Sequence, residues 1–191
     1  MKIVEATEKA VQTVYDMTRT KRAHVDQKAT MLTLKLVNDK GYPLQITFYI
    51  ANNDVAYRYT LLPVKDGNPR CAVIYGETSS FNFPDETRTF MTPQIQPMSG
   101  WQRTKPSYEE EFVPDARLTD KSKYGVGYTF PCLFRIPNKG NNTWILISET
   151  GTSSYPGCRL SEYEPTKGYH IAYPQAGENN GFGSEFASIP L

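Results

Sequence analysis

The chain has 191 residues, a formal net charge of +1, and 39% hydrophobic and 13% aromatic residues, which is enough for one domain with a substantial core. The 21 basic and 20 acidic residues give no basis for a nucleic-acid or membrane-surface partner, and no apolar run approaches membrane-spanning length or forms a signal-peptide core. The cysteines Cys71, Cys132 and Cys158 match no zinc-binding spacing, so free thiols are the default and a disulfide between one pair stays open.

The first half of the chain is dominated by strand-like alternation. Glu5 to Tyr15 is rich in Glu, Ala and Lys, a composition that suits a helix as well as a strand. Apolar and polar residues then alternate with period two in three runs separated by short polar turns: Thr30 to Val37, Leu44 to Ile50, and Val55 to Leu61. This pattern predicts an antiparallel meander.

Shorter strand signals continue through the second half. They lie at Cys71 to Tyr75, Tyr128 to Ile136, Thr143 to Ser148 and Gly168 to Tyr173, and a last apolar run begins at Phe186. Phe90 to Lys123 reads as a long polar loop, and Pro131 indicates an edge or a bulge in its strand. With no strong helix and no repeat, we predict an all-β fold, a large antiparallel β-sandwich forming a single domain over residues 1–191.

Glu149 follows the strand predicted at Thr143 to Ser148. Trp144 and Leu146 should face one side of this strand and Ile145 and Ile147 the other, so the strand reads as buried. Taken alone, a carboxylate at a strand end is more often a solvated loop-edge group than an aimed ligand.

Other chemical signals are sparse. There is no nucleophile elbow, phosphate-binding glycine loop, HExxH motif or Cys/His nucleophile pair. Paired carboxylates serve glycoside hydrolysis, but the sequence alone does not pair any two of the candidates Glu77, Glu109, Glu149 and Glu162. Trp101 suits either a sugar-stacking platform or a loop anchor, and the lone His170 is more often packed or solvent-facing than catalytic.

Several patches, in order along nearly the whole chain, resemble the N-terminal domain of glycoside hydrolase family 97. The most specific is Ile145 to Gly157, ILISETGTSSYPG. The others are Val14-Tyr15, Pro43 to Tyr59, Gly76-Glu77, Phe81 to Pro84, Ser107 to Phe112 and Thr129 to Pro131. The resemblance departs from the family pattern at Asp16, where glycine is usual.

The resemblance implies a galactose-mutarotase-like β-supersandwich from a secreted or periplasmic α-glucosidase or α-galactosidase. In that family a catalytic (β/α)8 barrel follows this domain and supplies most ligands of an active-site calcium ion. By motif position, Glu149 would be the one calcium ligand from the N-terminal domain. Because a barrel needs about 250 residues, the chain is expected to be an inactive fragment, incomplete at both ends. On this basis we expect Glu5 to Tyr15 to be extended.

Two other functions stay open. A stand-alone carbohydrate-binding module would use Trp101, Tyr108 or Tyr155 as stacking platforms. A mutarotase-like enzyme would use Glu149 as base and His170 as acid. The main hypothesis is a non-catalytic domain that supports the barrel, acts on α-linked oligosaccharides only through the full enzyme, and donates Glu149 to calcium.

Overall fold

The computed structural model describes residues 1–64, 72–94, 111–150, 158–173 and 187–189, and the chain divides into two compact units. The first unit comprises Met1–Cys71 with Pro190–Leu191, and the second comprises Ala72–Ile189. Every described element is a strand and every strand pairing is antiparallel, which confirms the expected all-β sandwich class. The single domain over residues 1–191 stays a prediction. Among the described residues no helix is long and apolar enough to cross a membrane.

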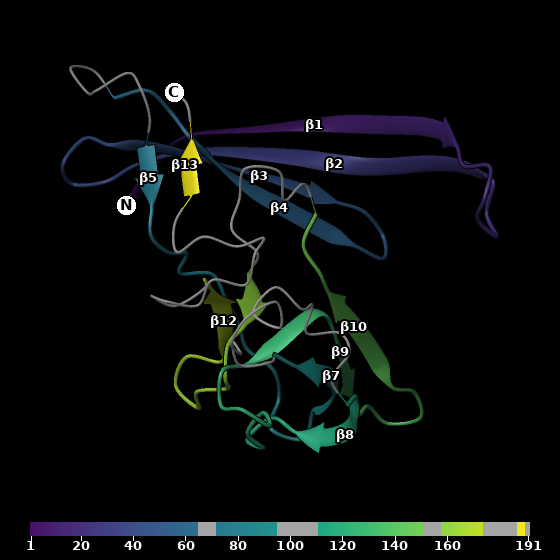
Figure 1. Cartoon of the computed structure of the whole chain (residues 1–191). Helices are drawn as coiled ribbons and strands as arrows, with labels where there is room; N and C mark the ends of the chain where they lie inside the picture. The colour runs from purple at the N-terminus through teal and green to yellow at the C-terminus, as the bar shows by residue number, and fades with distance from the viewer. Residues whose placement is uncertain (65–71, 95–110, 151–157, 174–186, 190–191) are drawn as a thin grey trace, which may run out of the picture. The chain divides into compact units, whose positions relative to one another are not determined.

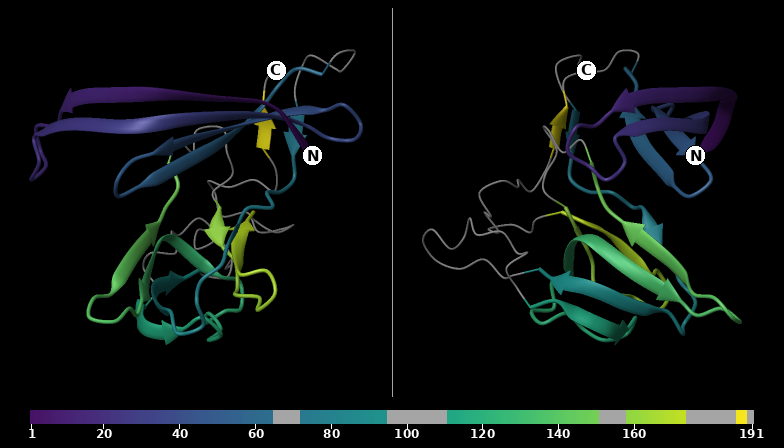
Figure 2. Two further views of the ribbon diagram at one scale, coloured as in Figure 1. Left: turned by 180° about the vertical axis from the view of Figure 1, so that it is seen from behind. Right: turned by 90° about the vertical axis from the view of Figure 1, so that its right-hand side faces the viewer.

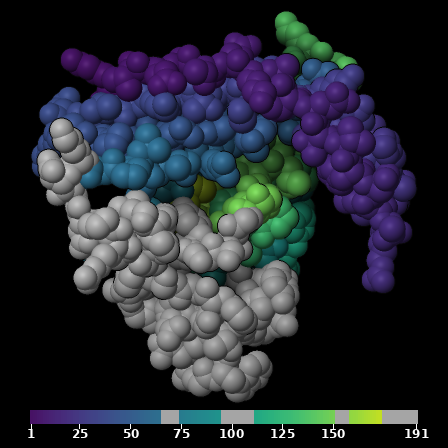
Figure 3. Space-filling view, turned by 90° about the horizontal axis from the view of Figure 1, so that it is seen from above, coloured from purple at the N-terminus to yellow at the C-terminus, as the bar shows by residue number. Residues whose placement is uncertain are grey.

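The first unit is a four-stranded meander in the order β1-β2-β3-β4 (Figure 1). Its strands are β1 (Lys2–Asp16), β2 (His24–Val37), β3 (Pro43–Ile50) and β4 (Val55–Leu61). The three predicted runs are therefore confirmed, and Glu5 to Tyr15 is extended as expected. The residues of this segment have high helix propensity, but strand pairing outweighs it. β1 pairs along its length with β2, from Lys2 opposite Val37 to Asp16 opposite His24. Figure 3 shows β1, in purple, beside the blue strands that follow it.

The register of the meander separates an apolar from a polar face. Leu32 lies opposite Phe48, which lies opposite Tyr57, so these three side chains share one face. The Phe48 and Tyr57 rings are 6.1 Å apart between centroids. The opposite face carries Thr33 and Thr47. Alternation in the sequence thus translated directly into sheet faces.

The second unit contains a seven-stranded sheet (Figure 2). Its path is β6-β12-β11-β9-β7-β8, and β10 pairs with β9 off this path. The strands are β6 (Ser80–Phe81), β7 (Arg88–Pro93), β8 (Val113–Arg117), β9 (Tyr128–Ile136), β10 (Thr143–Ile147), β11 (Arg159–Leu160) and β12 (Tyr169–Ala172). A separate pair joins β5 (Ala72–Ile74) to β13 (Ala187–Ile189), in agreement with the strand signals at residues 71–75 and after Phe186.

Two sequence expectations need correction. The predicted loop from Phe90 to Lys123 contains most of β7 and all of β8, because β8 lacks an alternating pattern and includes Asp115 at a φ of 57°. The strand at Thr143 is not buried on both faces: Trp144 is 51% and Leu146 63% exposed. Pro131 lies where the pairing of β7 with β9 shifts between Phe90 and Thr92, so the predicted bulge is confirmed.

The core of the second unit forms on one face of the large sheet. Phe134 and Tyr169 are fully buried, with ring centroids 5.6 Å apart, and Ile145 and Ile147 pack against the same cluster. Its other buried members are Met91, Leu118, Tyr128, Cys132 and Leu160. Burial raises the pKa of the Cys132 thiol to about 12, so this cysteine is a packed apolar side chain and not a reactive thiol.

Candidate functional site

Glu149 is placed by β10, whose inner face is fixed to the core. Ile145 lies opposite Phe134 and Ile147 opposite Cys132 on β9, while Trp144 and Leu146 point away from the core. This confirms the predicted alternation of side chains. The carboxylate of Glu149 therefore comes two residues after a strand that is held by both a backbone ladder and a packed face.

The Glu149 side chain is half-buried and has no ion pair among the described residues. Burial raises its pKa, the carboxylate of Glu77 adds to this increase, and a hydrogen bond from the backbone N–H of Cys158 opposes it. Cys158 is itself buried, directly before β11. One backbone donor thus orients a carboxylate whose negative charge has no neutralising partner in the described part of the chain.

This arrangement can supply a metal ligand but not a complete metal site. Within the described ranges, no three His, Cys, Asp or Glu side chains are grouped closely enough to hold an ion. Calcium takes six to eight oxygen ligands, carboxylates foremost among them. Glu149 fits the donor type and is partly desolvated, so it can contribute one ligand, with the remaining oxygens coming from elsewhere.

Glu162, another carboxylate singled out from the sequence, has a structural role. It accepts hydrogen bonds from the backbone N–H groups of Ser122 and Gly127, at 3.2 and 3.1 Å, and a short one from the Ser122 hydroxyl. These contacts tie the segment between β8 and β9 to the end of β11. Glu162 is therefore committed to the fold and is not paired with Glu149.

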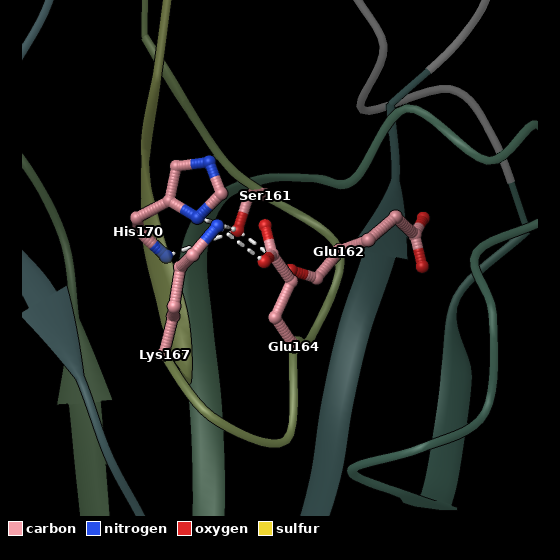
Figure 4. Close-up of polar contacts among 5 residues, drawn as sticks. All are labelled: Ser161, Glu162, Glu164, Lys167 and His170. Atoms are coloured by element: carbon pink, nitrogen blue, oxygen red, sulfur yellow. Dashed lines mark hydrogen bonds and ion pairs between the residues drawn. The ribbon is translucent and has the colours of Figure 1, made fainter.

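His170 on β12 is held by Ser161, the residue directly after the adjacent strand β11 (Figure 4). The Ser161 hydroxyl donates to the carbonyl of Glu162 at 2.7 Å, and it accepts from the backbone N–H of His170 at 2.9 Å. Nδ1 of His170 lies 2.9 Å from the same oxygen, so both the backbone and the ring of His170 contact Ser161. Nearby, Lys167 pairs with Glu164 at 2.8 Å. No described interaction joins His170 to Glu149, so nothing here brings together the predicted mutarotase pair.

The predicted stacking platforms Trp101, Tyr108 and Tyr155, and the carboxylate Glu109, lie outside the described residues. Glu77 is the neighbour of Glu149 that sequence reasoning did not pair with it, because 72 positions separate the two in the chain. The only available signal was that both occur in the patches that resemble the same family.

Two comparisons with known proteins both lead to glycoside-cleaving enzymes. The family model described as Glycosyl-hydrolase 97 N-terminal matches residues 1–187. Among solved structures, the crystal structure of a beta-arabinopyranosidase is 45% identical, covers 100% of this chain and superposes with a TM-score of 0.87. The chain spans only 30% of the length of that structure's chain. A search of curated proteins gives no match.

Proposed function

Because the chain belongs to the Glycosyl-hydrolase 97 N-terminal family, we propose that it is the non-catalytic domain of a calcium-dependent glycosidase. In this proposal it supports a catalytic barrel and contributes Glu149 to the calcium site. The observation that carries the proposal is the 45% identity to a glycosidase over the whole chain. The geometry at Glu149 supports the ligand role, since a half-buried carboxylate without an ion pair gains most from a nearby cation.

In the completed site, calcium would polarise a substrate oxygen as a Lewis acid and would orient the substrate. The residues of this chain would orient one calcium ligand and limit its solvation. The β9–β10 ladder and the Cys158 N–H would fix the direction of the Glu149 carboxylate. Burial next to Glu77 would keep that carboxylate poorly solvated, so that it binds a cation in preference to water.

The substrate of the proposed enzyme is a pyranoside. The structural neighbour is a beta-arabinopyranosidase, whereas the sequence resemblance led to α-glucosides and α-galactosides. A β-L-arabinopyranose ring has the configuration of α-D-galactopyranose without the C6 hydroxymethyl group. We therefore propose that the enzyme accepts an α-galactoside or a β-L-arabinopyranoside.

A chimera tests the supporting role. Residues 1–187 of this chain would replace the matching segment of the beta-arabinopyranosidase, and hydrolysis of a chromogenic arabinopyranoside and α-galactoside would be measured. The chimera should retain activity within about tenfold of the parent, and the isolated 191-residue chain should have none. A parent enzyme lacking the segment that is as active as the chimera would refute the supporting role.

A further inference from the structure

Three arginines occupy one row across the large sheet of the second unit. Arg88 on β7 lies directly opposite Arg117 on β8 and, on its other side, opposite Arg135 on β9. The three side chains therefore share one face of the sheet. Like charges placed directly opposite each other destabilise a strand pair unless a counter-charge lies between them.

Within the described ranges, a counter-charge lies at one end of this row. Arg135 pairs with Asp115 at 2.5 Å, and its guanidinium lies over the rings of Phe90 and Trp144. Asp115 takes a φ of 57° on the strand that carries Arg117, a conformation that costs energy in a residue with a side chain. Among the described residues, the side chains of Arg88 and Arg117 have no hydrogen bond and no ion pair.

Arg88 and Arg117 line a cleft of about 460 Å³, together with Asp85, Glu86, Leu118 and Tyr163. This volume lies within the range of small-molecule sites and exceeds what an inorganic anion needs. Although Asp85 and Glu86 line the same cleft, neither pairs with an arginine in the described part of the structure. The cleft thus offers donors and acceptors that are not paired with each other.

The walls of the cleft are held by the fold. Leu118 is 2% exposed, and its carbonyl accepts a hydrogen bond from the Tyr169 hydroxyl at 3.2 Å. Tyr163 packs on Tyr169 with ring centroids 5.2 Å apart. The backbone at Arg88 is held by strand pairing on both sides of β7. The apolar wall of the cleft and the backbone beneath the arginines are therefore already in place, which lowers part of the entropic cost of binding.

We propose that this cleft binds an acidic sugar, that is, a pyranose that carries a carboxylate. The carboxylate lies between the guanidiniums of Arg88 and Arg117, the fork-shaped partners that carboxylates bind best. Asp85 and Glu86 accept hydrogen bonds from ring hydroxyls, and Tyr163 with Leu118 contacts the apolar face of the ring. The two arginines are the evidence that the ligand is an anion. That the ligand is a sugar rests on the proposed glycosidase function.

Calorimetric titration of the full chain with three probes tests the proposal. D-Galacturonate should bind with a Kd on the order of 1 mM. D-Galactose, which has a hydroxymethyl group in place of the carboxylate, and acetate, which lacks the ring, should each bind at least about tenfold more weakly. Raising the salt from 0.15 to 1 M should weaken galacturonate binding because the contact is charged.

Matched variants locate the site. Arg88→Gln with Arg117→Gln should abolish galacturonate binding and leave thermal stability unchanged or raised, because a like-charge pair is removed. Arg58→Gln, at an exposed position of β4, should have no effect on galacturonate binding. Tyr163→Leu should weaken galacturonate binding but not acetate binding.

Equal binding of galactose, equal binding of acetate, an unaffected double variant, or no binding of galacturonate at 50-fold the expected Kd would each overturn the proposal. None of these results bears on Glu149, which does not line the cleft. Failure here is therefore distinct from failure of the calcium proposal.

Discussion

At the scale of single residues, the carboxylates of this chain differ by what surrounds them. Glu162 accepts three hydrogen bonds and fastens a segment of the fold, whereas Glu149 has one backbone donor and a second carboxylate nearby. In the sequence both were candidate carboxylates, and only Glu149 followed a predicted strand. The contacts that each side chain makes in the folded protein distinguish the structural role of Glu162 from the proposed ligand role of Glu149.

Glu162→Gln should lower the free energy of unfolding by about 2 kcal/mol, because an amide replaces a charged acceptor of several hydrogen bonds. Urea unfolding, followed by fluorescence, measures this difference. Glu164→Gln is the control, since the Glu164 side chain is 41% exposed and its ion pair among the described residues is with Lys167, three residues away. Equal midpoints for the Glu162 variant and the wild type would show that the three contacts contribute nothing.

Glu149 should instead make the isolated chain less stable. Its pKa is raised in the folded state, so folding takes up a proton, and stability decreases as the pH rises through the folded pKa. Glu149→Gln should therefore be more stable than the wild type at pH 7, and the difference should disappear by about pH 3, below the unfolded pKa of about 4.3. Thermal unfolding across this range measures it, with Glu8→Gln on exposed β1 as the control. A Glu149→Gln variant that is less stable than the wild type at pH 7 would contradict the claim that burial of the charged Glu149 side chain destabilises the fold.

At the scale of elements, the turns around Glu162 depend on glycine. Gly127 has a φ of 99°, and a Cβ there would collide with the carbonyl of Leu160. Gly140 has a similar φ of 90°, but a Cβ there would meet nothing within 4 Å. An alanine at Gly140 would add backbone strain alone, whereas an alanine at Gly127 would add both backbone strain and a steric collision.

Gly140→Ala should cost about 1 kcal/mol of stability through strain alone, and Gly127→Ala about 3 kcal/mol or more. Chemical unfolding of both variants gives the comparison. Equal losses would mean that the segment beside Leu160 moves freely to admit a methyl group.

Elements with period-two alternation could be predicted from the sequence, and others could not. The strands β2, β3, β4 and β9 carry regular patterns and lie within their predicted ranges or extend them, whereas β10 was predicted from a continuous apolar run. Their pattern follows from one buried face. β8 was missed because Pro114 and left-handed Asp115 break its alternation, and two-residue strands such as β6 and β11 are too short to carry a period.

The candidate site could be predicted only where local sequence determined it. The position of Glu149 after a strand was predictable, and so was the direction of Ile145 and Ile147. Its neighbour Glu77 lies 72 positions earlier and Cys158 nine positions later, and the cross-strand pairing of Arg88 with Arg117 joins positions 29 residues apart. Such pairs depend on register between strands, which no local pattern encodes.

At the scale of the whole molecule, the chain matches one part of a longer glycosidase, and its own carboxylates do not complete a calcium site in the described residues. We propose that this domain contributes a single ligand to a calcium site that another domain completes. Such a division predicts that calcium affinity depends on Glu149 but belongs to the assembled enzyme.

The most direct test is a calcium titration of the chimera by calorimetry, beside its Glu149→Gln and Glu77→Gln variants and the isolated chain. We predict that the chimera binds calcium, that Glu149→Gln weakens binding at least about tenfold, that Glu77→Gln changes it less, and that the isolated chain does not bind at 1 mM calcium. Unchanged calcium affinity in Glu149→Gln, with the variant folded, would contradict the central claim.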